Sequence, residues 1–273
     1  MQNLTSIILL FLSLTWVSSF TSELDFEAAF KRLTEGYHVE VEWKSGSHNI
    51  TTSDRFITAK NASDWELQAY APILLSEFNL YPASFVQKSQ LKRIVICRDL
   101  WVESQGINQN VSATPYDKDL FFCVSYTYKV NNRDKQRRVI HHAFFHMVDS
   151  AHGLIEKDKE WEKLNPEGFY YGMHGRGGHS DRTSKAGLLT AKYPGFLNKY
   201  STGYLADDKA DIFAYMMVLY HYVEKCADQD AIIKAKMQLM KTRLKQLSPE
   251  MDANFWNRIK EIKRDIRPYI TLD

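Results

Sequence analysis

The chain has 273 residues, of which 44% are hydrophobic and 25% charged, and its formal net charge is +2. This balance is typical of a globular protein with a sizeable core. The charge gives no preference for nucleic acid or for an anionic membrane, and no basic stripe with interleaved aromatic residues occurs. We therefore expect a globular protein that does not bind nucleic acid.

The first 20 residues resemble a secretion signal. Ile7 to Val17 is an apolar run without charge, and small residues that suit a cleavage site follow it. The run is too short to span a bilayer, so no stable membrane span is expected after cleavage. A charged segment before the run is missing, which leaves an uncleaved anchor as the alternative. We expect residues 21–273 to form a single domain of a secreted or lumenal protein.

The next segments mix helices and strands. Leu24 to Glu35 has helical spacing of its apolar residues. Tyr37 to Trp43 alternates apolar and polar residues, which predicts a strand that forms a hairpin with the run around Asp54 to Ala59. Asp64 to Phe78 returns to helical spacing.

Three asparagines outside the signal stand in Asn-x-Ser/Thr sequons, namely Asn49, Asn61 and Asn110. In a eukaryotic secretory pathway these side chains would carry N-linked glycans. Sequons also arise by chance, so they only support the prediction of secretion. The prediction is three glycosylation sites at the protein surface.

Leu91 to Leu100 and Leu120 to Val130 are rich in β-branched and aromatic residues, as in buried strands. Between them, Ser104 to Asp119 is polar and predicts a loop. Cys97 and Cys123 lie in the two strands, and an oxidising compartment would favour a disulfide between them. The alternative is that these residues and Cys226 are buried free thiols that pack as small hydrophobic residues.

The C-terminal part is mainly helical. Asn165 to Ser184 is rich in glycine, histidine and arginine and has no periodicity. Ala206 to Asp228, Ala231 to Leu247 and Asp252 to Arg267 each have the apolar spacing of a helix. Together with the preceding elements, these patterns predict an α+β fold with a small mixed sheet and C-terminal helices.

The segment Arg138 to Asp149 carries the strongest chemical signal. It belongs to a predicted helix that ends at Gly153, and it places His142 and His146 four residues apart on one face. Two histidines in this arrangement can share a Zn²⁺ ion. The H-E-x-x-H motif also needs a glutamate after the first histidine, as the base that deprotonates the metal-bound water. Here that position is Ala143.

A zinc site of this kind needs a third protein ligand. Asp207 is the best candidate, because it begins the next long helix, which can pack against the histidine helix. Asp211, one turn later, and Asp149, three residues beyond His146, are predicted to orient the histidines or to stabilise the helices. Alternatively, Asp207 only stabilises the start of its helix, because a negative charge in the first turn interacts favourably with the helix dipole.

The run His141 to Asp149 resembles the H-H-E-F-F-H-x-I-D motif of a group of gluzincin-type zinc metallopeptidases, related in site plan to the catalytic domain of anthrax lethal factor. The third ligand of that group is a glutamate in an E-D-x-A-E-x-F-A helix, matched by Asp207 to Ala214. Tyr200 matches the tyrosine that stabilises the oxyanion there. The resemblance covers residues 91–227 and implies a zincin-like fold, zinc, and a peptide or protein substrate or ligand.

Two positions depart from the pattern. Ala143 replaces the general base, and Asp207 replaces a glutamate that is one methylene longer. Zinc binding then requires that the Asp207 helix sits closer, or that His141, His174 or His179 assists. Loss of a general base commonly costs about 10²- to 10⁴-fold in rate. We therefore predict a catalytically impaired metallopeptidase-like protein that retains zinc and binds peptides.

Two other functions remain open. The protein is an active peptidase with a replacement base, such as Asp149 or Asp208, or a deliberately inactivated form of an active enzyme. Alternatively, it is a metal-free interaction protein that has kept the scaffold. Other hydrolase motifs are missing, since the sequence contains no G-x-S-x-G segment.

Overall fold

The computed structural model describes residues 25–44, 46–51, 55–104, 106–125, 133–153, 157–173 and 193–263. The predicted signal and the residues His174 and His179 lie outside these ranges. Among the described residues, no helix combines the length and the apolar character needed to cross a membrane.

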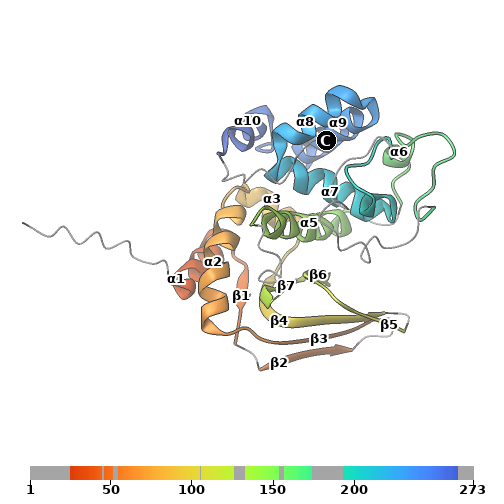
Figure 1. Ribbon diagram of the computed structural model, residues 1–273. Coiled ribbons are helices and arrows are strands. Elements are labelled where there is room, and N and C mark those ends of the chain that lie inside the picture. Colours follow the sequence, from red (N-terminus) through yellow and green to blue (C-terminus); the bar gives the residue numbers. More distant parts are fainter. Residues whose placement is uncertain are drawn as a thin grey trace, which may run out of the picture.

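A mixed seven-stranded sheet forms one layer of the described structure (Figure 1). The strands are β1 (Glu40–Glu42), β2 (Ser47–Thr51), β3 (Arg55–Asn61), β4 (Arg93–Ser104), β5 (Ile107–Asn110), β6 (Ala113–Tyr116) and β7 (Asp119–Cys123). The main path runs β2-β3-β4-β7-β6, and β1 and β5 also pair with β4. Strand β4 is parallel to β1 and β7 but antiparallel to β3 and β5.

Strand β4 is long and pairs with two sets of neighbouring strands. Its first half pairs with β1 and β7, and its second half pairs with β3 and β5. Between them, Asp99 has a φ of 51° and the pairing with β3 shifts register, as in a β-bulge. Ile94 and Ile96 belong to the main core, whereas Val95 and Cys97 belong to a second, smaller core.

Helices pack against the first half of the sheet, and further helices pack on those. They are α1 (Phe26–Tyr37), α2 (Asp64–Phe78), α3 (Ala83–Lys88), α5 (Arg133–Ala151), α6 (Lys159–Glu162), α7 (Leu205–Val218), α8 (Tyr220–Gln229), α9 (Ala231–Leu247) and α10 (Ala253–Glu261). In Figure 1, α5 lies between the sheet and the group formed by α7, α8, α9 and α10. The α+β class predicted from the sequence is confirmed.

Helix α5 is held in this central position by aromatic packing. Phe144 lies 5.3 Å from Phe78 of α2 between ring centroids, and Phe145 lies 5.0 Å from Phe213 of α7. Each fully buried side chain of this kind contributes roughly 1.5–3 kcal/mol. The apolar side of α5 is thus fixed to both neighbouring helices.

The predicted pairing of the N-terminal strands was wrong. We expected Tyr37 to Trp43 to form a hairpin with the run around Asp54 to Ala59, but β1 pairs in parallel with β4. The hairpin partner of β3 is β2, which lies between the two segments that we expected to pair. The error arose because β2 has the polar sequence Ser-His-Asn-Ile-Thr, which lacks the expected apolar alternation.

Two further boundaries differ from the expectation. The segment Ser104 to Asp119, predicted as a loop, contains β5 and β6. All four residues of β5 are exposed, so no apolar pattern marks that strand. The predicted helix Ala206 to Asp228 is divided into α7 and α8 at Leu219, which has φ −129° and ψ 49°.

Candidate metal centre

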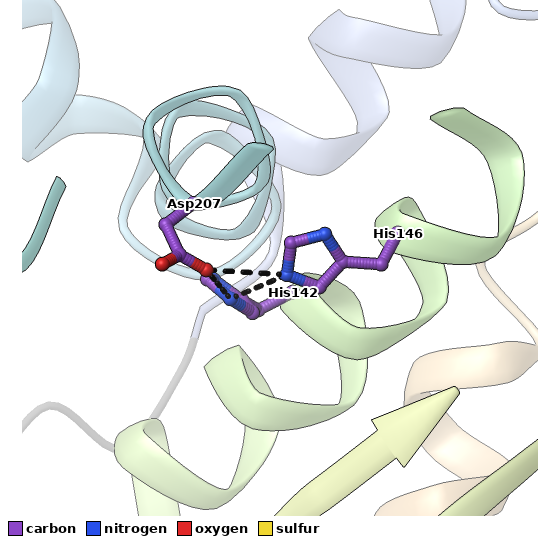
Figure 2. Close-up of side chains that lie close together, drawn as sticks. All are labelled: His142, His146 and Asp207. Atoms are coloured by element: carbon purple, nitrogen blue, oxygen red, sulfur yellow. Dashed lines mark hydrogen bonds and ion pairs between the residues drawn. The ribbon is translucent and has the colours of Figure 1, made fainter. Parts of the chain in front are cut away.

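The two histidines and the aspartate meet where α5 and α7 pack against each other. In Figure 2, His142 and His146 project from the same side of α5, and Asp207 approaches them from the first turn of α7. The two Nε2 atoms lie 3.0 Å apart. Asp207 Oδ1 lies 3.5 Å from Nε2 of His142 and 3.4 Å from Nε2 of His146.

This spacing fits a tetrahedral zinc ion. Zinc bonds of about 2.0–2.2 Å at tetrahedral angles place the donor atoms roughly 3.3–3.5 Å apart. The three separations of 3.0, 3.4 and 3.5 Å are close to that range. Two imidazoles and one carboxylate are also a donor set that zinc accepts at catalytic sites. The side chains of His142, His146 and Asp207 are therefore able to hold one ion.

Asp211 fixes the orientation of the first histidine. Its Oδ1 lies 2.9 Å from Nδ1 of His142, so it accepts a hydrogen bond from the protonated Nδ1 and leaves Nε2 to face the metal position. Its Oδ2 accepts hydrogen bonds from Asn198 Nδ2 at 2.8 Å and from Ser201 Oγ at 2.7 Å. Both carboxylate oxygens are thus engaged, and the carboxylate cannot rotate freely.

The charges at the centre favour binding of a cation. Burial alone would lower the pKa of His142, but Asp207 and Asp211 outweigh it and raise the pKa to about 9. Burial opposes ionisation of Asp207, yet the two histidines hold its pKa well below the usual range. In the metal-free protein, the two carboxylates thus stabilise the protonated, positively charged form of His142. A bound metal ion would supply that positive charge instead.

Tyr200 lies beside the centre, as its predicted role requires. It begins a short 3₁₀ helix (Tyr200–Thr202), and its ring centroid is 6.0 Å from that of His142. Burial raises the pKa of its hydroxyl, and the nearby carboxylates of Asp207 and Asp211, the former through a hydrogen bond, raise it further. The hydroxyl therefore stays protonated and remains a hydrogen-bond donor at the centre.

Two acids among the described residues near the centre were considered as replacement bases for Ala143, namely Asp149 and Asp208. Ala143 is buried, with 3% of its surface exposed, and its methyl group cannot accept a proton. Asp149 forms an ion pair with Lys209 at 2.7 Å instead of orienting a histidine. Asp208 is fully buried and forms an ion pair with Lys236 at 2.7 Å. Both acids that we considered as replacement bases are held in ion pairs.

The contacts of Asp208 include two more partners. Its Oδ2 accepts hydrogen bonds from Nε1 of Trp161 at 2.7 Å and from the hydroxyl of Tyr171 at 2.8 Å. Local sequence patterns did not predict this cluster or the buried lysines, because isolated charged residues on a helix normally face solvent. The alternation of acids and lysines with apolar residues in α7 was the only available signal.

His141 points away from the candidate centre. Its Nε2 lies 2.8 Å from Oε2 of Glu77, and its Nδ1 contacts the hydroxyl of Tyr81. The ring is fully buried among aromatic side chains. The expectation that His141 might assist as a ligand is therefore wrong, because both ring nitrogens already have partners.

The predicted disulfide is absent. Cys97 and Cys123 are direct partners in the β4–β7 register, but both are free thiols, as is Cys226. Cys97 Sγ donates a hydrogen bond to the carbonyl oxygen of Phe122 at 3.4 Å, and burial raises the pKa of this thiol. The structure thus agrees with the alternative of buried thiols that pack as small hydrophobic residues.

The three sequon asparagines lie on the surface of the sheet. Asn49 lies in β2, Asn61 ends β3 and Asn110 ends β5, and all three are exposed. Exposure of this kind is what a glycan needs in the folded protein, so glycosylation remains a prediction for these three positions.

Comparison with known proteins adds information on the fold. No family model and no curated protein matches the chain. Among solved structures, a crystal structure from Bacteroides caccae described as a "putative zinc-binding metallo-peptidase" is similar, with a TM-score of 0.51 and 16% sequence identity. The match covers 90% of this chain and 97% of that chain. At this identity the likeness shows only that the two chains share a fold.

Proposed function

We propose that this chain is a zinc-binding, metallopeptidase-like protein that binds peptides and hydrolyses them poorly or not at all. One observation carries the proposal: His142, His146 and Asp207 place three donor atoms at the spacing that a zinc ion requires, with Asp211 orienting His142. The fold shared with the Bacteroides caccae protein supports the same proposal.

The chain's own residues account for weak hydrolysis. A zinc ion bound here would supply a Lewis acid that polarises a peptide carbonyl. Asp207 would hold the ion, and the protonated hydroxyl of Tyr200 would donate a hydrogen bond to the carbonyl oxygen as negative charge develops on it. What the site lacks is a proton acceptor, since Ala143 offers a methyl group and Asp149 is bound to Lys209.

An edge of the sheet supports the proposed peptide binding. Strand β6 ends the main path of the sheet, pairs with β7, and lies against α5. A strand at a sheet edge can be extended by an added peptide strand, with backbone hydrogen bonds providing affinity. Pro115 lacks an N–H group and its carbonyl accepts a hydrogen bond from Arg55 at 3.3 Å, which limits the pairing that β6 can offer an added strand at this residue.

Secretion is part of the proposal. It is supported by the apolar run Ile7 to Val17 and by the exposed positions of the three sequon asparagines. Expression of the whole chain in a eukaryotic secretory host, followed by mass spectrometry of the secreted product, measures both signal cleavage and glycan occupancy. Retention of the whole protein inside the host cells would contradict secretion.

The metal content of the purified protein tests the central proposal. We expect about one zinc per chain by elemental analysis of protein purified without added zinc, and loss of the metal in the His142→Ala variant. His152→Ala is the matched control, because His152 directly follows the same helix but is exposed and does not belong to the candidate ligand group. Zinc that survives His142→Ala would assign the metal to another site.

A metal-free interaction protein predicts a different result. Wild-type protein would then contain no zinc, would not take it up from added zinc chloride, and would have the same melting temperature with and without chelator. That outcome would overturn the proposed function.

A further inference from the structure

Lys209 is a buried lysine next to the candidate metal ligand on α7. It follows Asp207 by two residues, and only 1% of its side chain is exposed. Its Nζ lies 2.7 Å from Oδ2 of Asp149, which follows His146 by three residues on α5. An ion pair therefore joins the two helices within one turn of a ligand on each of them.

The pair belongs to a larger network of ion pairs. Nζ of Lys209 also lies 3.5 Å from Oδ2 of Asp158, and the guanidinium of Arg243 binds both oxygens of Asp158 at 2.5 and 2.9 Å. Arg243 also pairs with the exposed Glu160 at 2.6 Å, so two basic groups face two buried acids and one exposed acid. Removal of one partner from such a buried network leaves an uncompensated charge. This lowers the stability of the fold far more than the loss of an exposed ion pair does.

The position of this network matches a requirement of the metal centre. An aspartate at position 207 reaches less far than a glutamate by one methylene, so α7 must lie close to α5 at its first turn. Aromatic packing between Phe145 and Phe213 fixes the helices about two turns of α7 further along. At the first turn itself, the pair of Lys209 and Asp149 joins the two helices directly.

We propose that Lys209 and Asp149 are positioning residues that hold the first turn of α7 against α5, at the separation that the short Asp207 side chain needs to reach the metal. The consequence for zinc rests on the proposed function, whereas the attachment of the helix is a property of the metal-free protein. A residue that merely stabilises the fold would lower the melting temperature without selectively loosening this turn or weakening metal binding.

Hydrogen exchange of the metal-free protein tests the attachment directly. We expect Lys209→Met to accelerate amide exchange in peptides that cover residues 205–211, and Asp149→Asn to do the same more mildly. Lys209→Arg keeps the charge and should restore much of the protection. Ile259→Ala in α10 is the matched control, because it removes a buried side chain from a helix that packs on α8. Equal exchange of this turn in Lys209→Met and Ile259→Ala would overturn the proposal.

Zinc affinity tests the consequence for the metal. By chelator competition, we expect Lys209→Met to weaken zinc binding about 10- to 100-fold, the range typical of residues that support metal ligands. Ile259→Ala should bind zinc as the wild type does. Unchanged affinity in both Lys209→Met and Asp149→Asn would overturn the positioning role. Wild-type protein that binds no zinc would instead refute the proposed function, while hydrogen exchange would still decide whether the pair holds the helix.

Discussion

His142 and Asp211 face each other across the contact between α5 and α7, with Nδ1 of the histidine 2.9 Å from Oδ1 of the aspartate. This contact decides which ring nitrogen carries the proton, and it leaves Nε2 unprotonated when a metal binds. The same carboxylate accepts hydrogen bonds from Asn198 and Ser201, on the segment that carries Tyr200. One side chain therefore orients a candidate ligand and anchors the segment that carries Tyr200.

Replacement of Asp211 by asparagine should weaken zinc binding about 10- to 100-fold. The amide keeps the shape of the side chain but removes the negative charge that stabilises the Nδ1–H group of His142. Competition with a chromophoric chelator measures the change. Asp228→Asn, an exposed acid in α8, is the control for loss of one negative charge. An affinity equal to that of the wild type would show that Asp211 has no role in metal binding.

Replacement of Ala143 by glutamate should produce peptide hydrolysis. A carboxylate at this position can accept a proton from water, and general-base catalysis typically contributes about 10²- to 10⁴-fold. A fluorogenic peptide library measures the gain. Ala143→Gln is the matched control, because it adds the same volume at a buried position without a base. Equal rates in the two variants would argue against the proposal that a missing base limits hydrolysis.

Metal-free protein should lose stability as the pH rises from 6.5 to about 9. The pKa of His142 is raised from 6.5 to about 9 in the folded state, so its stabilising contribution is complete below pH 6.5 and disappears as the pH passes 9. The loss is about 3 kcal/mol at most. Urea unfolding in the presence of chelator measures it, and His142→Ala should lack this part of the pH dependence.

Zinc affinity should change with pH in the opposite direction. Zinc and a proton compete for Nε2 of His142, so we expect the apparent affinity to rise up to about pH 9 and then to level off. Titrations at several pH values with a metal buffer measure the slope. A flat profile between pH 6.5 and 9 would mean that His142 is not a ligand.

Lys236→Met should destabilise the protein strongly. The variant leaves the fully buried Asp208 without its cation, and breaking a buried pair in this way typically costs about 3–5 kcal/mol. Asp208→Asn combined with Lys236→Met should recover much of the loss, because no uncompensated charge remains. Urea unfolding of the two variants makes the comparison. A double variant that is no more stable than the single one would show that the charge balance is unimportant.

The cysteines should all react as thiols once the protein is unfolded. We expect three alkylated cysteines per chain under non-reducing denaturing conditions, and slow reaction in the native protein, because Cys97, Cys123 and Cys226 are free and buried. Mass spectrometry counts the modified residues. A single alkylated cysteine would instead reveal a disulfide.

The sequence predicted the elements whose apolar residues follow a clear period. The bounds of α2 agree with the predicted Asp64 to Phe78, because its buried residues recur at helical spacing. The grouping of His142 and His146 followed from their four-residue separation alone. The addition of Asp207 depended on the resemblance and on the position of an acid at a helix start.

Other features could not be predicted from local patterns. The parallel pairing of β1 with β4 joins residues about 50 positions apart, and nothing in a three-residue strand specifies such a partner. The ion pair between Lys209 and Asp149 was missed because charged residues are rarely buried unless paired, and their pairing is visible only in three dimensions.

The bulge at Asp99 separates two halves of β4 that differ in how well they tolerate mutations and insertions. The inner half lies beneath the helices that carry the candidate metal ligands, whereas the outer half pairs with β3 and β5. Mutations, insertions or grafted loops in this outer layer would therefore leave the contact between α5 and α7 intact. Over evolutionary time, new binding partners could be acquired there at little risk to the metal centre.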